Sequence, residues 1–277
     1  MAAVVLTAAL TGPIASKGDN PYLPTTPEEI AADAKLAWEA GAAVVHVHLR
    51  DTVGRPTADL EIARRTVGLI GESCPALIQL STGVGLQVPY EDRAKLVEVR
   101  PRMATLNVGS MSFGSGEFRN PPDGVRRLAE RMRELGIKPE LEVYDTGHLD
   151  LALSLHDEGL LQEPLQFSIV MGVKGGMAAD PEQLLSFVRR LPSGSVWQVI
   201  ALGRWNLPMT AIGLALGGNA RTGMEDTLLM RRGVVAKSNA ELVERLAGVA
   251  RALELEPASV EQTERILSLT AVRSAPS

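Results

Sequence analysis

Cysteine and long apolar runs are both scarce in this sequence, and each absence narrows the class of protein. Cys74 is the only cysteine among 277 residues, which excludes an internal disulfide and suits a reducing compartment. No run of about 18 apolar residues occurs, so no transmembrane helix is predicted. The apolar N-terminus also lacks the basic segment of a signal peptide. The sequence therefore predicts a cytoplasmic protein that does not enter a membrane.

Basic charge is limited as well. The chain has 28 lysines and arginines against 33 aspartates and glutamates, a net charge of −5, and its pI is about 5.5. With no block of basic residues, neither nucleic acid nor an anionic membrane is expected as a partner. What is present is an ordinary globular composition, 45% hydrophobic and 22% charged, in a chain long enough to bury a sizeable core.

Short apolar runs alternate with helical patterns along the whole chain. The clearest helix covers residues 26–41, where Thr26 precedes a proline in the first turn and Gly41 ends the pattern. The other predicted helices cover 57–72, 90–98, 122–135, 147–158, 180–190, 208–216 and 238–253. The predicted strands cover 4–10, 42–48, 76–82, 103–109, 139–145, 165–172, 196–203 and 219–224.

Eight strands, each followed by a helix, predict an α/β fold of the (β/α)8 TIM-barrel type. Such barrels use about 250 residues as one domain, so residues 1–277 are expected to form a single unit. A doubly wound open sheet is the alternative, but no G-x-G-x-x-G motif follows the first strand. A last helix at about 259–270 is expected to pack outside the barrel.

Two of the four histidines stand two positions apart, in the stretch VVHVHLRD at residues 44–51. Side chains at i and i+2 of a strand point to the same side, so His46 and His48 project together. At the C-terminal end of a barrel strand, two such imidazoles can reach one divalent metal ion. The alternative is a pair of hydrogen-bonded histidines in a polar barrel mouth. His148 and His156 are expected at the surface or in an interface between subunits.

A metal site needs at least a third ligand, and a carboxylate at the end of the last strand is available in GMEDT. Glu225 is the candidate ligand, and the adjacent Asp226 is placed to act as a base. Two histidines, one carboxylate and an open position suit Zn²⁺ as a Lewis acid on a carbonyl group. The same three ligands also suit iron or manganese. The alternative for both acids is a solvated turn or a helix N-terminus.

Other polar residues at the predicted strand ends suit a small anionic substrate. The loop STGVG supplies hydroxyl and backbone N–H groups. Arg221 can pair with a carboxylate or orient Asp226, and Thr105 and Asn107 share one strand face. The alternative for each is a turn or barrel-layer residue. The candidates for binding or positioning a substrate are Ser81, Thr82, Gly83, Gly85, Thr105, Asn107 and Arg221.

Taken together, the motifs resemble those of the β-keto acid cleavage enzymes, whose best known member cleaves 3-keto-5-aminohexanoate in lysine fermentation. The resemblance runs from residue 4 to residue 270 with the motifs in the same order. They are TAALTG (7–12), NPYLPTTPEEIA (20–31), AGAAVVHVHLRD (40–51), QLSTG (79–83), MATLNVGSMSFG (103–114), PELEVYDTG (139–147), GGNARTGMED (217–226) and GVVAKSNAELV (233–243).

The resemblance implies a zinc-dependent TIM barrel, usually a homotetramer, that converts a β-keto acid and acetyl-CoA into acetoacetate and a new acyl-CoA. Carried over by motif, the zinc ligands are His46, His48 and Glu225. Asp226 is the base that removes the proton between the keto and carboxylate groups. Arg221 orients Asp226, with Glu142 as a further partner, and the substrate contacts are Ser81, Gly85 and Thr105.

The sequence departs from the family pattern at several positions. Where the aminohexanoate enzyme has a glutamate that holds the substrate ammonium, this chain has Ile14. An aliphatic side chain cannot pair a cation, so a neutral or apolar acyl chain is expected instead. Asn206 and Asn219 replace histidines and are expected near the mouth. Lys174 is placed to meet an anionic acyl tail or a CoA phosphate, or else it is solvated.

Substrate contact within STGVG is assigned to either Gly83 or Gly85, because Val84 interrupts the family's glycine pair. A zinc hydrolase or aldolase on the same barrel is the alternative function, and it differs by needing no CoA. A third possibility is a non-catalytic barrel that has lost its metal. The presence of His46, His48, Glu225 and Asp226 argues against it.

Overall fold

A closed barrel of eight parallel strands forms the centre of the protein in our computed structural model, which describes residues 1–269. β11 closes the barrel by pairing with β2, in the register Ala220 to Leu6, so the open-sheet alternative is excluded and the predicted TIM barrel is confirmed. In barrel order the strands are β10 (Val196–Ala201), β11 (Asn219–Thr222), β2 (Leu6–Ala9), β3 (Val44–Val47), β4 (Leu77–Leu80), β5 (Met103–Asn107), β8 (Lys138–Val143) and β9 (Gln166–Met171).

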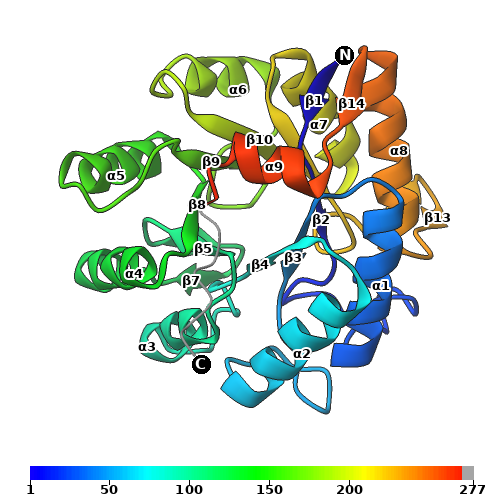
Figure 1. Ribbon diagram of the computed structural model, residues 1–277, viewed down its shortest axis with the longest axis horizontal. Coiled ribbons are helices and arrows are strands. Elements are labelled where there is room, and N and C mark those ends of the chain that lie inside the picture. Colours follow the sequence, from blue (N-terminus) through cyan, green and yellow to red (C-terminus); the bar gives the residue numbers. More distant parts are fainter. Residues whose placement is uncertain (270–277) are drawn as a thin grey trace.

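Helices surround the barrel on its outer side (Figure 1). The capping signal predicted for the first of them is present: Thr26 accepts a hydrogen bond from the backbone of Glu29, whose side chain accepts one from Thr26 N–H. The helices are α1 (Pro27–Glu39), α2 (Leu60–Ser73), α3 (Tyr90–Ala94), η1 (Lys95–Val99), α4 (Pro122–Leu135), α5 (Thr146–Asp157), α6 (Pro181–Val188), η2 (Gly203–Trp205), α7 (Asn206–Ala215) and α8 (Asn239–Ala252).

The barrel interior is polar at the level below the predicted site. Thr7 Oγ1 donates to Gln198 Oε1 at 3.0 Å, and Gln198 Nε2 donates to Glu140 Oε1 at 2.7 Å and to Ser168 Oγ at 2.9 Å. These bonds run between β2, β10, β8 and β9. The alternate residues of the same strands face outward and pack in the apolar clusters under the helices. The strands are therefore apolar on the outside and hydrogen-bonded across the lumen.

An apolar plug closes the N-terminal end of the barrel. Val44, Leu77 and Met103, which begin three of the strands, pack with Leu267 and with residues of α9 (Val260–Ile266). Figure 1 shows α9 lying across this end of the barrel, outside the lumen. The predicted helix at 259–270 is shorter than expected, and residue 270 lies outside the described residues. A small sheet of β1 (Ala2–Val4) and β14 (Leu255–Pro257) flanks it.

Two short hairpins lie among the loops that follow the barrel strands. β6 (Met111–Phe113) and β7 (Gly116–Phe118) follow β5, and β12 (Leu229–Arg231) and β13 (Val234–Val235) follow β11. Because the other end is plugged, access to the lumen is from this C-terminal end. The helices formed by residues 1–269 are all too short or too polar to span a bilayer.

Candidate active site

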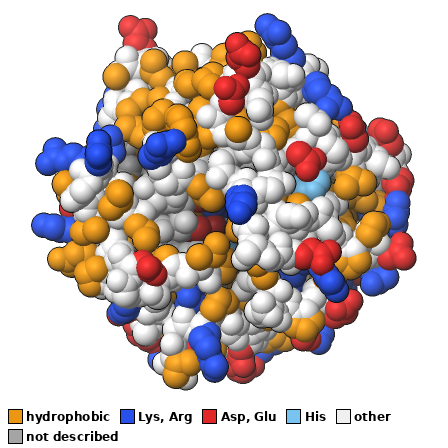
Figure 2. Space-filling view, turned by 180° about the vertical axis from the view of Figure 1, so that it is seen from behind, with side chains coloured by type: hydrophobic (Ala, Val, Ile, Leu, Met, Phe, Trp, Pro, Cys, Tyr) orange, Lys and Arg blue, Asp and Glu red, His pale blue; other side chains and the backbone are white. Residues whose placement is uncertain are grey.

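A cavity of about 690 Å³ opens at the C-terminal ends of the strands. Figure 2, which shows the face opposite to the α9 plug, is hollowed near its centre, with hydrophobic side chains on the rim. Most of the charged residues in the wall of the cavity gather at one place. They include Glu142 from β8, Arg221 from β11, and Glu225 and Asp226 from the loop after β11, together with His48. This is where chemistry is expected in a TIM barrel.

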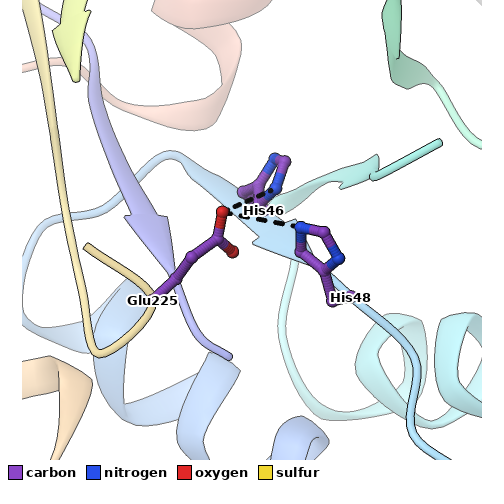
Figure 3. A group of neighbouring side chains, drawn as sticks. All are labelled: His46, His48 and Glu225. Carbon is purple, nitrogen blue, oxygen red and sulfur yellow. Dashed lines mark ion pairs between the residues drawn. The ribbon is translucent and has the colours of Figure 1, made fainter. Parts of the chain in front are cut away.

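The two histidines and Glu225 converge on one point. His46 Nε2 and His48 Nε2 each lie 3.5 Å from Glu225 Oε1, and Figure 3 shows both rings turned toward the carboxylate. One ligand atom from each of the three residues lies within 4.8 Å of the others. His46 Nε2 and Glu225 Oε2 are buried and accept or donate no hydrogen bond among residues 1–269. Buried polar atoms left without partners around one point fit a divalent metal ion.

The electrostatic surroundings favour the metal-binding forms of His48 and Glu225. Burial lowers the pKa of His48, which keeps its imidazole neutral. Burial alone would raise the pKa of Glu225, but Arg221 and the two imidazoles hold the pKa well below its usual range. At His46 burial would lower the pKa, and the carboxylate of Glu225 raises it instead. An ionised Glu225 beside a neutral His48 is a pair of ready ligands.

Gln79, on the neighbouring strand β4, orients the more deeply buried histidine. Its Oε1 lies 2.8 Å from His46 Nδ1. An amide oxygen can only accept, so Nδ1 carries a proton, and in the neutral ring Nε2 presents its lone pair to the point shared with Glu225. The sequence analysis did not single out Gln79, although it stands in the QLSTG motif. The signal was an amide in an otherwise apolar strand.

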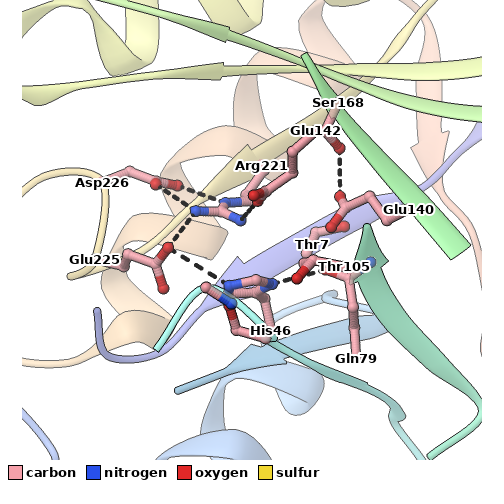
Figure 4. A network of polar contacts seen from close by, with 12 residues as sticks. Thr7, His46, Gln79, Thr105, Glu140, Glu142, Ser168, Arg221, Glu225 and Asp226 are labelled. Carbon is pink, nitrogen blue, oxygen red and sulfur yellow. Dashed lines mark hydrogen bonds and ion pairs between the residues drawn. The ribbon is translucent and has the colours of Figure 1, made fainter. Parts of the chain in front are cut away.

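Arg221 joins the three acidic residues of the site (Figure 4). Its guanidinium contacts both oxygens of Asp226, at 3.0 Å through Nε and 2.8 Å through Nη2, and Nη2 also lies 2.6 Å from Glu225 Oε1. Nη1 lies 3.7 Å from Glu142 Oε1. Burial raises the pKa of Asp226 in spite of Arg221. A carboxylate with a raised pKa, held in one orientation beside a ligand cluster, is suited to remove a proton from a bound molecule.

Glu142, at the edge of the cluster, also has a perturbed pKa. Burial, with the neighbouring Glu140, raises the pKa of Glu142 to about 7. Its Oε2 accepts a hydrogen bond from Tyr144 Oη at 3.3 Å. Glu142 therefore changes charge near neutral pH at the edge of the cluster.

The comparison with known proteins assigns this arrangement to a family. A family model described as beta-keto acid cleavage enzyme matches residues 3–269. The chain belongs to this family. A 3-keto-5-aminohexanoate cleavage enzyme from Fusobacterium nucleatum subsp. nucleatum is 38% identical over 271 residues, 97% of this chain and 99% of that protein. A 3-oxoadipate:acetyl-CoA acetyltransferase from Cupriavidus necator is 35% identical over 269 residues, 96% of this chain and 94% of that protein.

A solved structure supports the fold of this β-keto acid cleavage enzyme. The ternary complex of ObcA with a C4-CoA adduct and oxalate has a TM-score of 0.79 and 24% identity, and the match covers 90% of this chain and 68% of ObcA. The family and its named relatives confirm the predicted enzyme class, and they do not favour the hydrolase or aldolase alternative.

The predicted substrate contacts of the β-keto acid cleavage enzyme divide into two groups. The cavity wall includes Ile14, Ser81, Gly83 and Gly85. Both glycines that the sequence left open therefore face the cavity, and only Gly85 has a positive φ, 116°. A φ in this range strains any residue with a Cβ, which explains why glycine is needed there.

The other predicted contacts, Thr82, Thr105 and Asn107, are not among the described residues that line the cavity and lie behind its wall. Thr82 and Thr105 bond each other: Thr82 N–H donates to Thr105 Oγ1, and Thr82 Oγ1 donates to Thr105 O, both at 2.9 Å. Asn107 is buried beside Gly83, and neither of its amide atoms has a hydrogen-bond partner within residues 1–269. In this structure these residues therefore hold the STGVG loop from behind.

Two further expectations from the sequence are wrong, those for Asn219 and His148, and that for Asn206 holds only for its place. Asn219 lies at the N-terminal end of β11, where it accepts from Val5 N–H and donates to Trp197 O, far from the mouth. Asn206 does lie near the mouth, because it donates to Ala201 O at the end of β10 and accepts from Thr222 Oγ1 at the end of β11. It is buried, however, and is not among the residues that line the cavity. His148 is buried too, and its Nδ1 accepts from Tyr144 N–H at 3.4 Å.

One wall of the cavity is apolar, and its residues were not predicted from the sequence. Val170 of β9 and Ile200 of β10 stand opposite each other in the strand register. They pack in one cluster with residues of the β6–β7 hairpin and of the loops nearby. The apolar lining of this wall consists of Phe113, Phe118, Val170, Val173, Ile200 and Leu202, with Tyr144. Lys174 is exposed and is not among the residues that line the cavity.

Proposed function

We propose that this protein is a zinc-dependent β-keto acid cleavage enzyme that uses acetyl-CoA and releases acetoacetate and a new acyl-CoA. The observation that carries the proposal is the convergence of His46, His48 and Glu225 beside the Arg221–Asp226 pair at the base of one cavity. The acetyl-CoA-dependent activities named for several relatives support the choice of co-substrate.

The residues of the site suit an acid–base mechanism without a covalent enzyme intermediate. Asp226 takes a proton from the carbon between the keto and carboxylate groups, and the resulting carbanion attacks the thioester carbonyl of acetyl-CoA, releasing the CoA thiolate. The thiolate then attacks the original keto carbon, and the carbon–carbon bond breaks to give the new acyl-CoA. The acetoacetate carbanion recovers its proton from Asp226. Atoms and protons balance over the cycle.

The roles of the remaining residues follow from their positions. His46, His48 and Glu225 would hold Zn²⁺, which when bound supplies a Lewis acid for the keto oxygen. Arg221 keeps the carboxylate of Asp226 in one orientation and offsets its charge. Ser81 and the N–H groups around Gly83 and Gly85 are placed to bind the substrate carboxylate.

The acyl tail is proposed to be neutral or apolar. Apart from the charged cluster at the base, the charged residues in the cavity wall are Asp51 and Arg55, which pair with each other at 3.0 Å. A charged tail would therefore meet no free counter-charge, and burying it unpaired is costly. The apolar wall around Val170 and Ile200, and Ile14 in the loop after β2, favour a hydrocarbon tail.

The test is a panel of β-keto acids with apolar, anionic and cationic tails, incubated with zinc-loaded protein in the presence and absence of acetyl-CoA. New acyl-CoA is followed by mass spectrometry. We expect turnover of the apolar acids only, and only with acetyl-CoA. Ile14→Glu should add turnover of an aminated acid, whereas the uncharged control Ile14→Gln should not. Cleavage without any thioester would contradict the proposal and favour a hydrolase or aldolase.

Two further expectations rest on the family resemblance and the sequence. We infer that the protein works as a homotetramer in the cytoplasm, without nucleic acid or membrane partners. Light scattering on the purified protein measures its oligomeric state, and a monomer at micromolar concentration would contradict the first of these.

A further inference from the structure

Asn239, the first residue of α8, connects three segments that are far apart in the sequence. It belongs to the motif GVVAKSNAELV, which neither the metal cluster nor the substrate loop uses. Its side chain is fully buried. Nδ2 donates to Leu10 O at 2.9 Å and to Asp33 Oδ2 in α1, and Oδ1 accepts from Met224 N–H at 2.7 Å. The backbone N–H of Asn239 also donates to Asp33 Oδ1, at 3.3 Å.

Both backbone groups that Asn239 holds adjoin the active site. Met224 directly precedes Glu225, and Leu10 directly follows β2, two residues before Gly12. The packing between these two segments is tight: a Cβ built on Gly12 would lie 2.6 Å from Glu225 Cγ. The same loop is tied to β2 by a second bond, from Glu225 N–H to Ala9 O at 3.2 Å. The position of Glu225 therefore depends on how β2 and its own loop are held together.

Only an amide side chain satisfies all of these partners. The group at this position must accept from Met224 N–H and at the same time donate to Leu10 O and to the Asp33 carboxylate. Asp33 is buried in α1, and within residues 1–269 its carboxylate accepts hydrogen bonds from Asn239 alone. It holds the amide in the orientation that puts the oxygen toward Met224.

We propose that Asn239 and Asp33 are positioning residues that set Glu225 for metal binding. The inference rests on the proposed zinc function, and it assigns a role in metal affinity to two residues that do not touch the metal site. Supporting partners of this kind change metal affinity by about 10–100-fold when they are lost.

The test compares Asn239→Asp with the double variant Asp33→Asn/Asn239→Asp. In Asn239→Asp the bond from Met224 survives, but Leu10 O loses its donor and two carboxylates face each other. The double variant exchanges amide and carboxylate, so a donor from residue 33 again meets an acceptor at residue 239. We expect zinc affinity to fall about 10–100-fold in Asn239→Asp. The zinc affinity of the double variant should be closer to that of wild type than to that of Asn239→Asp.

Zinc affinity is measured by competition with a chelator on protein shown to be folded, without substrate, and Co²⁺ absorption spectra report the ligand geometry. Asn120→Asp is the matched control. Asn120 is a buried amide that donates to Gly109 O and accepts from Arg93, on the hairpin side of the barrel away from Glu225. This control should lower the melting temperature and leave zinc affinity unchanged. If Asn239→Asp does not fold, Asp33→Asn replaces it, because this variant weakens only the bond between residues 33 and 239. It should lower zinc affinity in the same direction but by less.

The outcomes separate the inference from the proposed function. If Asn239→Asp loses thermal stability but binds zinc as wild type does, or if the exchange brings no recovery, the positioning role is overturned while the metal site stands. If the wild-type protein itself binds no zinc, the proposed function fails first.

Discussion

Gly12 offers a direct test of the site because a single added methyl group would reach the proposed metal ligand. Its φ lies outside the left-handed region, so alanine is free of backbone strain there. The added Cβ would lie 2.6 Å from Glu225 Cγ, 3.3 Å from Glu225 Cβ and 3.4 Å from Glu225 Cα. Carbon atoms pack at roughly 3.5–4.0 Å. Glu225 would therefore have to retreat by about 1 Å in Gly12→Ala.

A displacement of that size is large for a metal ligand. Metal–ligand distances hold to about 0.2 Å, and a misplacement of about 1 Å at a reacting centre costs on the order of 10²-fold. We expect Gly12→Ala to bind zinc about 10–100-fold more weakly and to lose turnover in proportion. Chelator competition and steady-state kinetics with an apolar β-keto acid measure the two effects.

Gly68→Ala is the matched control for this experiment. Gly68 lies in the exposed part of α2, and a Cβ there meets nothing within 4 Å. Alanine is favoured over glycine inside a helix by about 1 kcal/mol, so this variant should be as stable as wild type or more so, with unchanged zinc affinity. Equal zinc affinities for Gly12→Ala and Gly68→Ala would refute the placement of Glu225 in a metal site against Gly12.

Two further predictions concern the acids beside the ligand cluster. Asp226→Asn should lower kcat by about 10²–10⁴-fold and leave zinc bound, as metal analysis of the purified variant would verify; normal turnover would rule Asp226 out as the base. Burial raises the pKa of Glu142 to about 7 in the folded protein, above the value of an exposed carboxyl group. Its contribution to the free energy of unfolding is therefore fully present below about pH 4.3 and is lost as the pH rises through about 7. Urea unfolding of metal-free protein at intervals from pH 4 to 8 should show this loss in wild type and less of it in Glu142→Gln, and equal slopes for both proteins would contradict the role of burial at Glu142.

The secondary structure was predictable because its signals are local. Each barrel strand is a short apolar run, and the capping residues at Thr26 and the glycine at Gly41 mark the limits of the first helix. The predicted strands extend beyond the observed ones at their C-terminal ends. The reason is that the alternation of side chains continues through residues such as His48 and Ser81, although the hydrogen-bonded strands end before them. The candidate metal ligands were likewise visible, as an alternating histidine pair and an acidic dipeptide.

The other contacts of the site depend on residues far apart in the sequence, and no short sequence pattern predicts such pairs. The bond from His46 to Gln79 depends on the register between β3 and β4. The contact of Asn239 with Asp33 spans 206 positions. Asn219 is a polar residue of the kind found in active sites, but it lies at the N-terminal end of its strand. Its place depends only on where β11 begins.

The sequence by itself determined the barrel, its strand–helix units and the residue types that can bind a metal, because alternation along a strand and capping of a helix are properties of neighbouring residues. Only the tertiary structure decided which of those residues share one cavity, which stand behind it, and that an apolar wall faces the charged cluster. That wall is built from β9, β10 and a hairpin after β5. Closure of the barrel alone brings them together, since it fixes the level at which each strand ends.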